Sequence, residues 1–128
     1  MKALIDSHTF LWFVNDDPRL SETARSLISA PGNVLYLSIA SAWELAIKFS
    51  IGKLVLSQPF PDFLEEQLAL NTFRLLSIDP THLRCVVGLP FHHKDPFDRL
   101  LIAQSLTDAL PLISLDTKMD AYGVNRIW

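Results

Sequence analysis

Short apolar runs alternate with segments of helical periodicity along most of the chain. The runs predict strands at residues 2–6, 34–38, 73–78 and 112–115, with a short last strand at 125–128. Their residues are continuously apolar and do not alternate with polar ones. This pattern is typical of strands that are buried on both faces of a parallel sheet.

Helical periodicity fills the segments between these strands. Apolar spacing, caps and breakers predict helices at residues 21–30, 39–51, 62–70 and 95–109. The last of these has the clearest boundaries, because Asp95 can cap it, Pro96 occupies its first position and Pro111 follows its end. Strands alternating with helices predict an α/β fold, in which a parallel sheet of four to five strands has helices on both faces.

Length, charge and cysteine content narrow the class of protein. The chain has 128 residues, 49% of them apolar, which favours a single domain over residues 1–128 with a packed core. The net charge of −3 argues against binding nucleic acid by bulk positive charge, but it does not exclude an enzyme that meets nucleic acid through metal ions. A single cysteine excludes an internal disulfide and a Cys-rich zinc site. The apolar runs are too short to span a membrane, and the N-terminus lacks the shape of a signal peptide, so we expect a soluble cytoplasmic protein.

The apolar content leaves two interpretations open. The mean hydropathy is +0.24, and the chain has eight Phe and three Trp residues. These side chains either fill the core or partly face a partner. The run from Phe10 to Phe13 fits both interpretations, whereas helical spacing predicts Trp43 in the core. Cys85 is expected to be a small buried apolar residue.

Acidic residues recur where a predicted strand passes into a helix. Asp6, Glu44, Asp98 and Asp116 all occupy such positions, and parallel α/β folds place their chemistry at this edge of the sheet. Each residue also has a structural explanation. Asp6 and Asp116 can be helix N-caps, Ser41 and Glu44 match a capping box, and Asp95 and Asp98 imitate one.

Four carboxylates at one edge call for a counterion. They repel one another, and burying them unpaired costs free energy. Mg²⁺ or Mn²⁺ prefers carboxylate and water oxygens, and the chain offers no comparable set of Cys and His residues. Such a metal site suits phosphodiester hydrolysis, in which a metal-bound water attacks the phosphorus.

Four segments in order resemble the PIN-domain ribonucleases, specifically the VapC-type toxins of toxin–antitoxin pairs. The first is Leu-Ile-Asp-Ser-His-Thr-Phe-Leu-Trp at residues 4–12. The second is Ser-Ile-Ala-Ser-Ala-Trp-Glu-Leu-Ala-Ile-Lys at 38–48, followed by Gly-Lys-Leu at 52–54. The third is His-Lys-Asp-Pro-Phe-Asp-Arg-Leu-Leu-Ile-Ala-Gln at 93–104. The fourth is Leu-Ile-Ser-Leu-Asp at 112–116, with Tyr-Gly-Val at 122–124.

The resemblance covers nearly the whole chain and implies a three-layer α/β/α PIN-like fold. It also implies a Mg²⁺-dependent endoribonuclease, with Mn²⁺ as a substitute, that hydrolyses single-stranded or looped RNA. The catalytic, metal-binding carboxylates of the family carry over to Asp6, Glu44, Asp98 and Asp116. Asp95 then supports these ligands, and Ser114 matches a Ser or Thr that assists the site. The implied partners are a cognate antitoxin and a second copy of the chain in a homodimer.

Several polar residues near these segments have two interpretations. Lys48, Lys53, Lys94, His92 and His93 either line a path for RNA or form a solvated face. Arg99 either reaches a phosphate or carboxylate, or is a surface arginine of its helix. His8 is expected to have a structural role in its turn.

Two rival functions are consistent with the same residues. One is another metal-dependent phosphoesterase, such as a 5′-nuclease acting on DNA, although 128 residues leave little room for the DNA-binding elements it needs. The other is a non-catalytic binding module whose carboxylates serve only as caps. A metal titration separates this second alternative from both enzymes.

Overall fold

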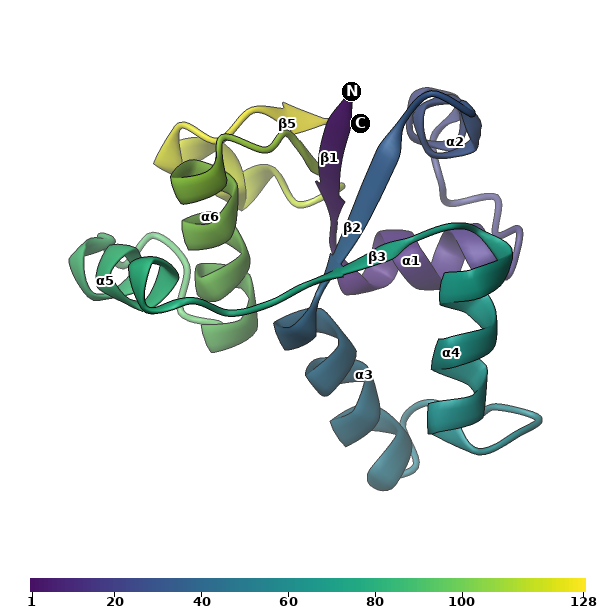
Figure 1. Ribbon diagram of the computed structural model, residues 1–128. Helices are drawn as coiled ribbons and strands as arrows, with labels where there is room; N and C mark the ends of the chain where they lie inside the picture. The colour runs from purple at the N-terminus through teal and green to yellow at the C-terminus, as the bar shows by residue number, and fades with distance from the viewer.

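A five-stranded parallel sheet forms the centre of the computed structural model, which describes residues 1–128. In chain order, the strands are β1 (Lys2–Ile5), β2 (Val34–Ser38), β3 (Arg74–Leu76), β4 (Leu112–Ile113) and β5 (Arg126–Ile127). Their order across the sheet is β3-β2-β1-β4-β5, and every neighbouring pair is parallel (Figure 1). The predicted parallel sheet is confirmed, although all strands except β2 are shorter than the apolar runs that predicted them.

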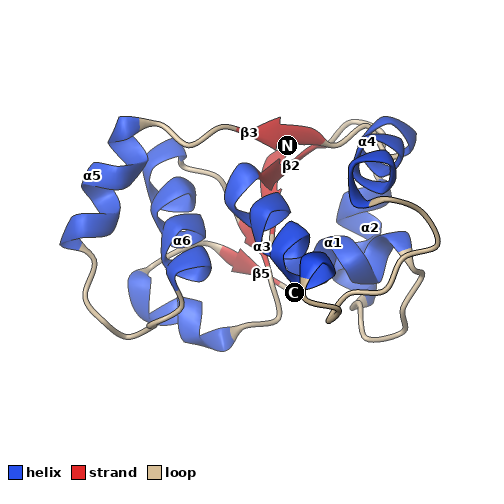
Figure 2. Cartoon of the chain, turned by 90° about the horizontal axis from the view of Figure 1, so that it is seen from below, coloured by secondary structure: helices blue, strands red, loops and turns tan.

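Helices cover both faces of this sheet. They are α1 (Ser7–Val14), α2 (Glu22–Ser29), α3 (Ile39–Ser50), α4 (Phe60–Leu70), α5 (Pro80–Gly88), α6 (Pro96–Asp108) and a 3₁₀ helix, η1 (Thr117–Tyr122). Figure 2 shows α5 and α6 on one side of the sheet and α1, α2 and α4 on the other. This arrangement confirms the predicted three layers. None of the helices is both long enough and apolar enough to cross a membrane.

Two apolar clusters lie on opposite faces of the sheet. Ile5 belongs to the first cluster together with Phe10 and Leu45, whereas its neighbour Leu4 belongs to the second together with Ile102. Successive side chains of a strand point to opposite faces, so a strand that is covered on both sides needs apolar residues at every position. This requirement explains why the strand runs are continuously apolar.

Four sequence-based expectations are corrected by the structure. The sequence pattern predicts no helix within residues 79–94, yet this segment contains α5, whose N-cap is Asp79. Trp43 is 60% exposed and does not lie in the core. Cys85 is only half-buried. The capping box of Ser41 and Glu44 is absent, because α3 begins earlier and Ser38 caps it by accepting a hydrogen bond from the Ala40 amide.

The strand order reverses its direction at β1. The chain moves outward from β1 to β2 and β3 on one side, and β4 and β5 lie on the other side. Connections that leave the sheet on opposite sides of such a switch point open a crevice at the carboxyl ends of the strands. Asp6 follows β1 directly, so the topology places this carboxylate at the crevice.

Candidate active site

A cavity of about 470 Å³ lies at the carboxyl ends of β1 and β4. The structure places all four candidate ligands at this cavity, although they come from four separate elements or loops of the chain. Its lining comprises the acidic residues Asp6, Glu44, Asp95, Asp98 and Asp116 and the residues Ser7, His8, Trp12, Lys48 and Leu115. Lys48 is therefore the only Lys or Arg among the lining residues, against five carboxylates.

Asp6 is fixed by both of its carboxylate oxygens. Oδ1 accepts a hydrogen bond of 2.8 Å from the Thr9 amide, which makes Asp6 the N-cap of α1. Oδ2 accepts a bond of 2.5 Å from the Ser114 hydroxyl, which comes from the segment after β4. The Thr9 hydroxyl donates to the Ile113 carbonyl at 3.1 Å, and so the segments after β1 and β4 are joined. Capping and site formation are thus compatible roles for one aspartate.

Glu44 reaches the cavity from the second turn of α3. Its Oε1 accepts a hydrogen bond of 2.6 Å from the Ser7 hydroxyl, and its Oε2 lies 3.9 Å from the Lys48 ammonium nitrogen. Glu44 caps no helix, so the structural explanation offered by its sequence context does not apply. Its position is instead determined by a contact between α3 and the first residue of α1.

Asp95 and Asp98 lie together at the start of α6. The Asp95 Oδ1 accepts hydrogen bonds from the amides of Phe97 and Asp98, at 2.9 and 3.1 Å. The pKa of Asp98 is raised to about 7, first by burial and next by the negative charge of Asp95. His93 lowers this pKa, whereas the charges of Glu44 and Asp6 add smaller increases. A cation bound near this carboxyl group would favour its charged form and oppose this rise in pKa.

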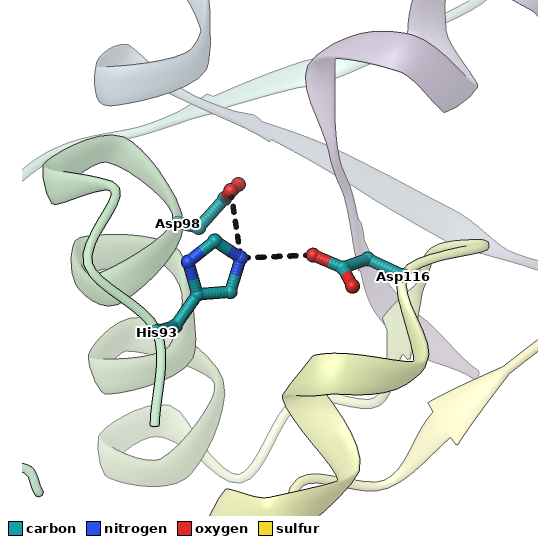
Figure 3. Close-up of side chains that lie close together, drawn as sticks. All are labelled: His93, Asp98 and Asp116. Carbon is teal, nitrogen blue, oxygen red and sulfur yellow. Dashed lines mark hydrogen bonds and ion pairs between the residues drawn. The ribbon is translucent and has the colours of Figure 1, made fainter. Parts of the chain in front are cut away.

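His93 bridges two of the carboxylates (Figure 3). Its Nε2 lies 3.1 Å from Asp98 Oδ2 and 2.9 Å from Asp116 Oδ2. Asp116 also caps η1, since its Oδ1 accepts a hydrogen bond of 3.0 Å from the Lys118 amide. From the sequence, His93 is expected either to line a path for RNA or to belong to a solvated face, and its contact with two carboxylates is not predicted. Its position in the sequence, two residues before the N-cap Asp95, could have indicated this contact. The turn into α6 brings a residue at that position close to the first turn of the helix.

Arg99 has neither of the roles that the sequence suggested. Its side chain is buried and donates hydrogen bonds to four backbone carbonyls, that of Val86 in the last turn of α5 and those of Leu89, Pro90 and His93 in the α5–α6 connection. The Phe91 ring lies over its guanidinium at 4.1 Å. Arg99 therefore organises the loop that carries His93.

The remaining candidates around the site divide between the cavity and the surface. His8 and Trp12 line the cavity, with their ring centroids 5.8 Å apart, whereas Phe10 is fully buried in the core. Lys53, Lys94 and His92 are exposed residues outside the cavity lining.

The donor set fits a hard divalent cation. Five carboxylates meet in one cavity, where burial weakens the screening of their repulsion by water. Mg²⁺ and Mn²⁺ prefer carboxylate oxygens and retain several waters, for which the cavity has space. The carboxyl groups of Asp6, Glu44, Asp98 and Asp116 are therefore suitable ligands.

Comparison with known proteins supports the architecture and gives the family. Over an alignment of 69 residues, this chain is 33% identical to Ribonuclease VapC16 of Mycobacterium tuberculosis. The alignment spans 51% of this chain and 49% of that relative. The alignment thus covers about half of the relative's length.

Solved structures show the same fold at low sequence identity. The chain is similar to VapBC2 from Rickettsia felis bound to a promoter DNA fragment, with a TM-score of 0.72, 12% identity and coverage of 99% of this chain and 98% of that one. It is also similar to FitAcB from Neisseria gonorrhoeae, with a TM-score of 0.67, 19% identity and coverage of 100% of this chain and 97% of that one. A third similar structure is a toxin–antitoxin complex from Klebsiella pneumoniae, with a TM-score of 0.64, 19% identity and coverage of 98% of this chain and 96% of that one.

The family model for the PIN domain matches residues 3–125, which include β1 without its first residue, every element from α1 to η1 and all five carboxylates of the cavity. This chain belongs to the PIN domain family.

Proposed function

We propose that this chain is a Mg²⁺-dependent endoribonuclease that hydrolyses phosphodiester bonds of single-stranded or looped RNA. We further propose that residues 1–128 act as one nuclease domain, the toxin of a toxin–antitoxin pair, in the cytoplasm. The observation that carries the proposal is the convergence of five carboxylates in one cavity at the switch point of the sheet. The local sequence similarity to a ribonuclease agrees with it.

Asp6, Glu44, Asp98 and Asp116 would hold the metal, and Asp95 would support them. A bound Mg²⁺ or Mn²⁺ supplies an activated water and stabilises the charge that develops on the phosphate. The residues of the chain fix the ligands beforehand, since Ser114 holds Asp6 and Ser7 holds Glu44 through hydrogen bonds. Ligands that are already oriented need little reorganisation when the substrate binds.

The apolar part of the cavity lining suits a nucleotide. His8, Trp12 and Leu115 give it aromatic and apolar surface beside the carboxylates. Unpaired bases can stack on such side chains, whereas bases in a duplex are already stacked on each other. Lys48 offers one cation for a phosphate, so binding depends strongly on the metal and weakens as salt concentration rises.

A cognate antitoxin and a second copy of the chain are the proposed protein partners. The similar structure from Klebsiella pneumoniae is a toxin–antitoxin complex. An antitoxin arginine that entered the cavity could form bidentate hydrogen bonds with the carboxylates and compete with the metal. The exposed apolar residues Ile39 and Trp43 of α3 give a homodimer a surface to bury.

The experiment is an RNA cleavage assay with a metal titration. We expect cleavage of single-stranded RNA with Mg²⁺ or Mn²⁺, and none in EDTA. Asp6→Asn should abolish cleavage, whereas Glu65→Gln, which removes an exposed carboxylate of α4 outside the cavity, should leave it unchanged. Cleavage that persists in EDTA, or in the Asp6→Asn variant, contradicts the proposal.

The binding-module alternative has one observation in its favour, since Asp6, Asp95 and Asp116 all cap helices. Capping does not explain Glu44 and Asp98, which cap nothing and still line the cavity. A purified protein that binds no Mn²⁺ in a titration would favour this alternative over both nuclease hypotheses.

A further inference from the structure

We propose that His93 is a positioning residue that holds Asp98 and Asp116 in place for the metal without becoming a metal ligand. The Nε2–H of its imidazole donates to both carboxylates. The inference rests on the proposed function, because it assigns a role to His93 at the same metal site. It concerns how the site is assembled, which the activity itself does not reveal.

The hydrogen bonds of the ring determine which nitrogen carries the proton. His93 Nδ1 accepts a bond of 3.3 Å from the Asp95 amide. A neutral imidazole has one donor and one acceptor nitrogen, so acceptance at Nδ1 places the proton on Nε2. This is the nitrogen at 3.1 and 2.9 Å from the oxygens of Asp98 and Asp116. While the Asp95 contact persists, Nε2 has no free lone pair for a metal.

The backbone of His93 is held as firmly as its ring. Its amide donates to the Tyr122 hydroxyl at 2.7 Å, and that hydroxyl donates to the Pro90 carbonyl at 2.7 Å. The His93 carbonyl accepts from the buried Arg99 guanidinium at 3.2 Å. Arg99 and Tyr122 come from α6 and η1, the elements beside Asp98 and Asp116. The same elements therefore fix His93 and the two carboxylates that it joins.

Other carboxylates of the cavity are held in the same way. The Ser114 hydroxyl donates to Asp6, and the Ser7 hydroxyl donates to Glu44. Each donor is neutral and engages one oxygen of its carboxylate. Partners of this kind orient metal ligands and raise metal affinity. His93 differs only in serving two carboxylates, and its ring spans the space between α6 and the start of η1 (Figure 3).

The test measures Mn²⁺ affinity by electron paramagnetic resonance, without RNA. We expect His93→Ala to weaken Mn²⁺ binding by about 10- to 100-fold. His93→Gln should recover most of this loss, because its amide N–H₂ can donate where Nε2–H does. Lys94→Ala, an exposed neighbour in the same loop, is the matched control and should bind Mn²⁺ like the wild type.

A second measurement follows the ring itself. Nitrogen NMR of labelled histidine should show the proton on Nε2 of His93, both without metal and after saturation with Mg²⁺. Loss of that proton on Mg²⁺ binding would identify His93 as a ligand and overturn the inference. Unchanged or tighter Mn²⁺ binding by His93→Ala would overturn it as well. If His93→Ala does not fold, as judged by circular dichroism, the Gln variant and the NMR measurement decide.

Failure of the inference can be distinguished from failure of the proposed function. If the wild type binds Mn²⁺ and Asp6→Asn does not, the metal site stands, and an unaffected His93→Ala refutes only the role of His93. If the wild type binds no Mn²⁺, both proposals fail together.

Discussion

Replacing Asp98 by Asn should stabilise the metal-free protein, and the gain should grow with pH. Burial and the neighbouring Asp95 raise the pKa of Asp98 from 3.8 to about 7. Between these two values, the folded protein holds a proton on Asp98 that the unfolded chain releases. Wild-type stability therefore falls as pH rises from about 4 to about 7 and then stays at its lower level. An amide has no such charge, and so the Asn variant avoids this loss.

The size of the effect follows from the shift. The pKa rises by about 3 units, and each unit corresponds to about 1.36 kcal/mol, which gives roughly 4 kcal/mol as an upper limit. The Asp98 side chain is 27% exposed, so water screens part of the interaction. We therefore expect a gain of about 2 kcal/mol in the free energy of unfolding above pH 7, and almost none near pH 4.

Urea unfolding in EDTA measures this difference directly. Wild type, Asp98→Asn and the control Glu65→Gln should be compared at about pH 5 and about pH 8, which lie on either side of the raised pKa. The difference in the free energy of unfolding between wild type and Asp98→Asn should be clearly larger at the higher pH. The difference between wild type and Glu65→Gln should be the same at both pH values. The electrostatic reasoning would be refuted if wild type and Asp98→Asn differed equally at both pH values. It would also be refuted if Asp98→Asn were less stable than wild type at the higher pH.

Four further predictions use other contacts of the structure. Mg²⁺ should raise the melting temperature of the wild type more than that of Asp98→Asn, as thermal melts can show, because it binds only the folded state. Arg99→Met removes the donor of four hydrogen bonds to backbone carbonyls, although the Val86 and Pro90 carbonyls keep a second donor, and it should lower the free energy of unfolding by about 3 kcal/mol in a urea titration. His82 is fully buried and joins the Asp79 amide to Asp108, so His82→Ala should cost about 3 kcal/mol in the same assay. Trp43→Ser should shift sedimentation velocity profiles from dimer to monomer and change the circular dichroism spectrum little, because Trp43 is largely exposed.

The fold was predictable because its signals are local. A strand that is buried on both faces must be apolar at each position, which made β1 and β2 visible in the sequence. The boundaries of α6 followed from Asp95 and Pro96, whose chemistry acts within one helical turn. Helix α5 was missed because its apolar pattern is weak, and its exposed residues Leu83 and Val87 obscure the buried side.

The site was predictable only in part, because some of its contacts are local and others join distant parts of the chain. The rule that parallel strands end at one edge was enough to group Asp6 and Asp116. The partners of these carboxylates depend on contacts across long stretches of chain, such as the bond from Ser7 to Glu44, which no spacing in the sequence encodes. The burial of Arg99 was equally hidden, because an arginine in the first turn of a helix usually faces water.

The pairing of β1 with β4 has a consequence for biosynthesis. Asp6 emerges from the ribosome early, but its partner Ser114 and the neighbouring Asp116 follow only after more than a hundred further residues, since 108 positions separate Asp6 from Ser114. At a synthesis rate of roughly 5–20 residues per second, the delay is on the order of 5–20 s. During this time, the nascent chain has an incomplete set of carboxylates and no β4 to hold β1 in place. A metal site that needs both strands therefore forms only after β4 has been synthesised, long after Asp6.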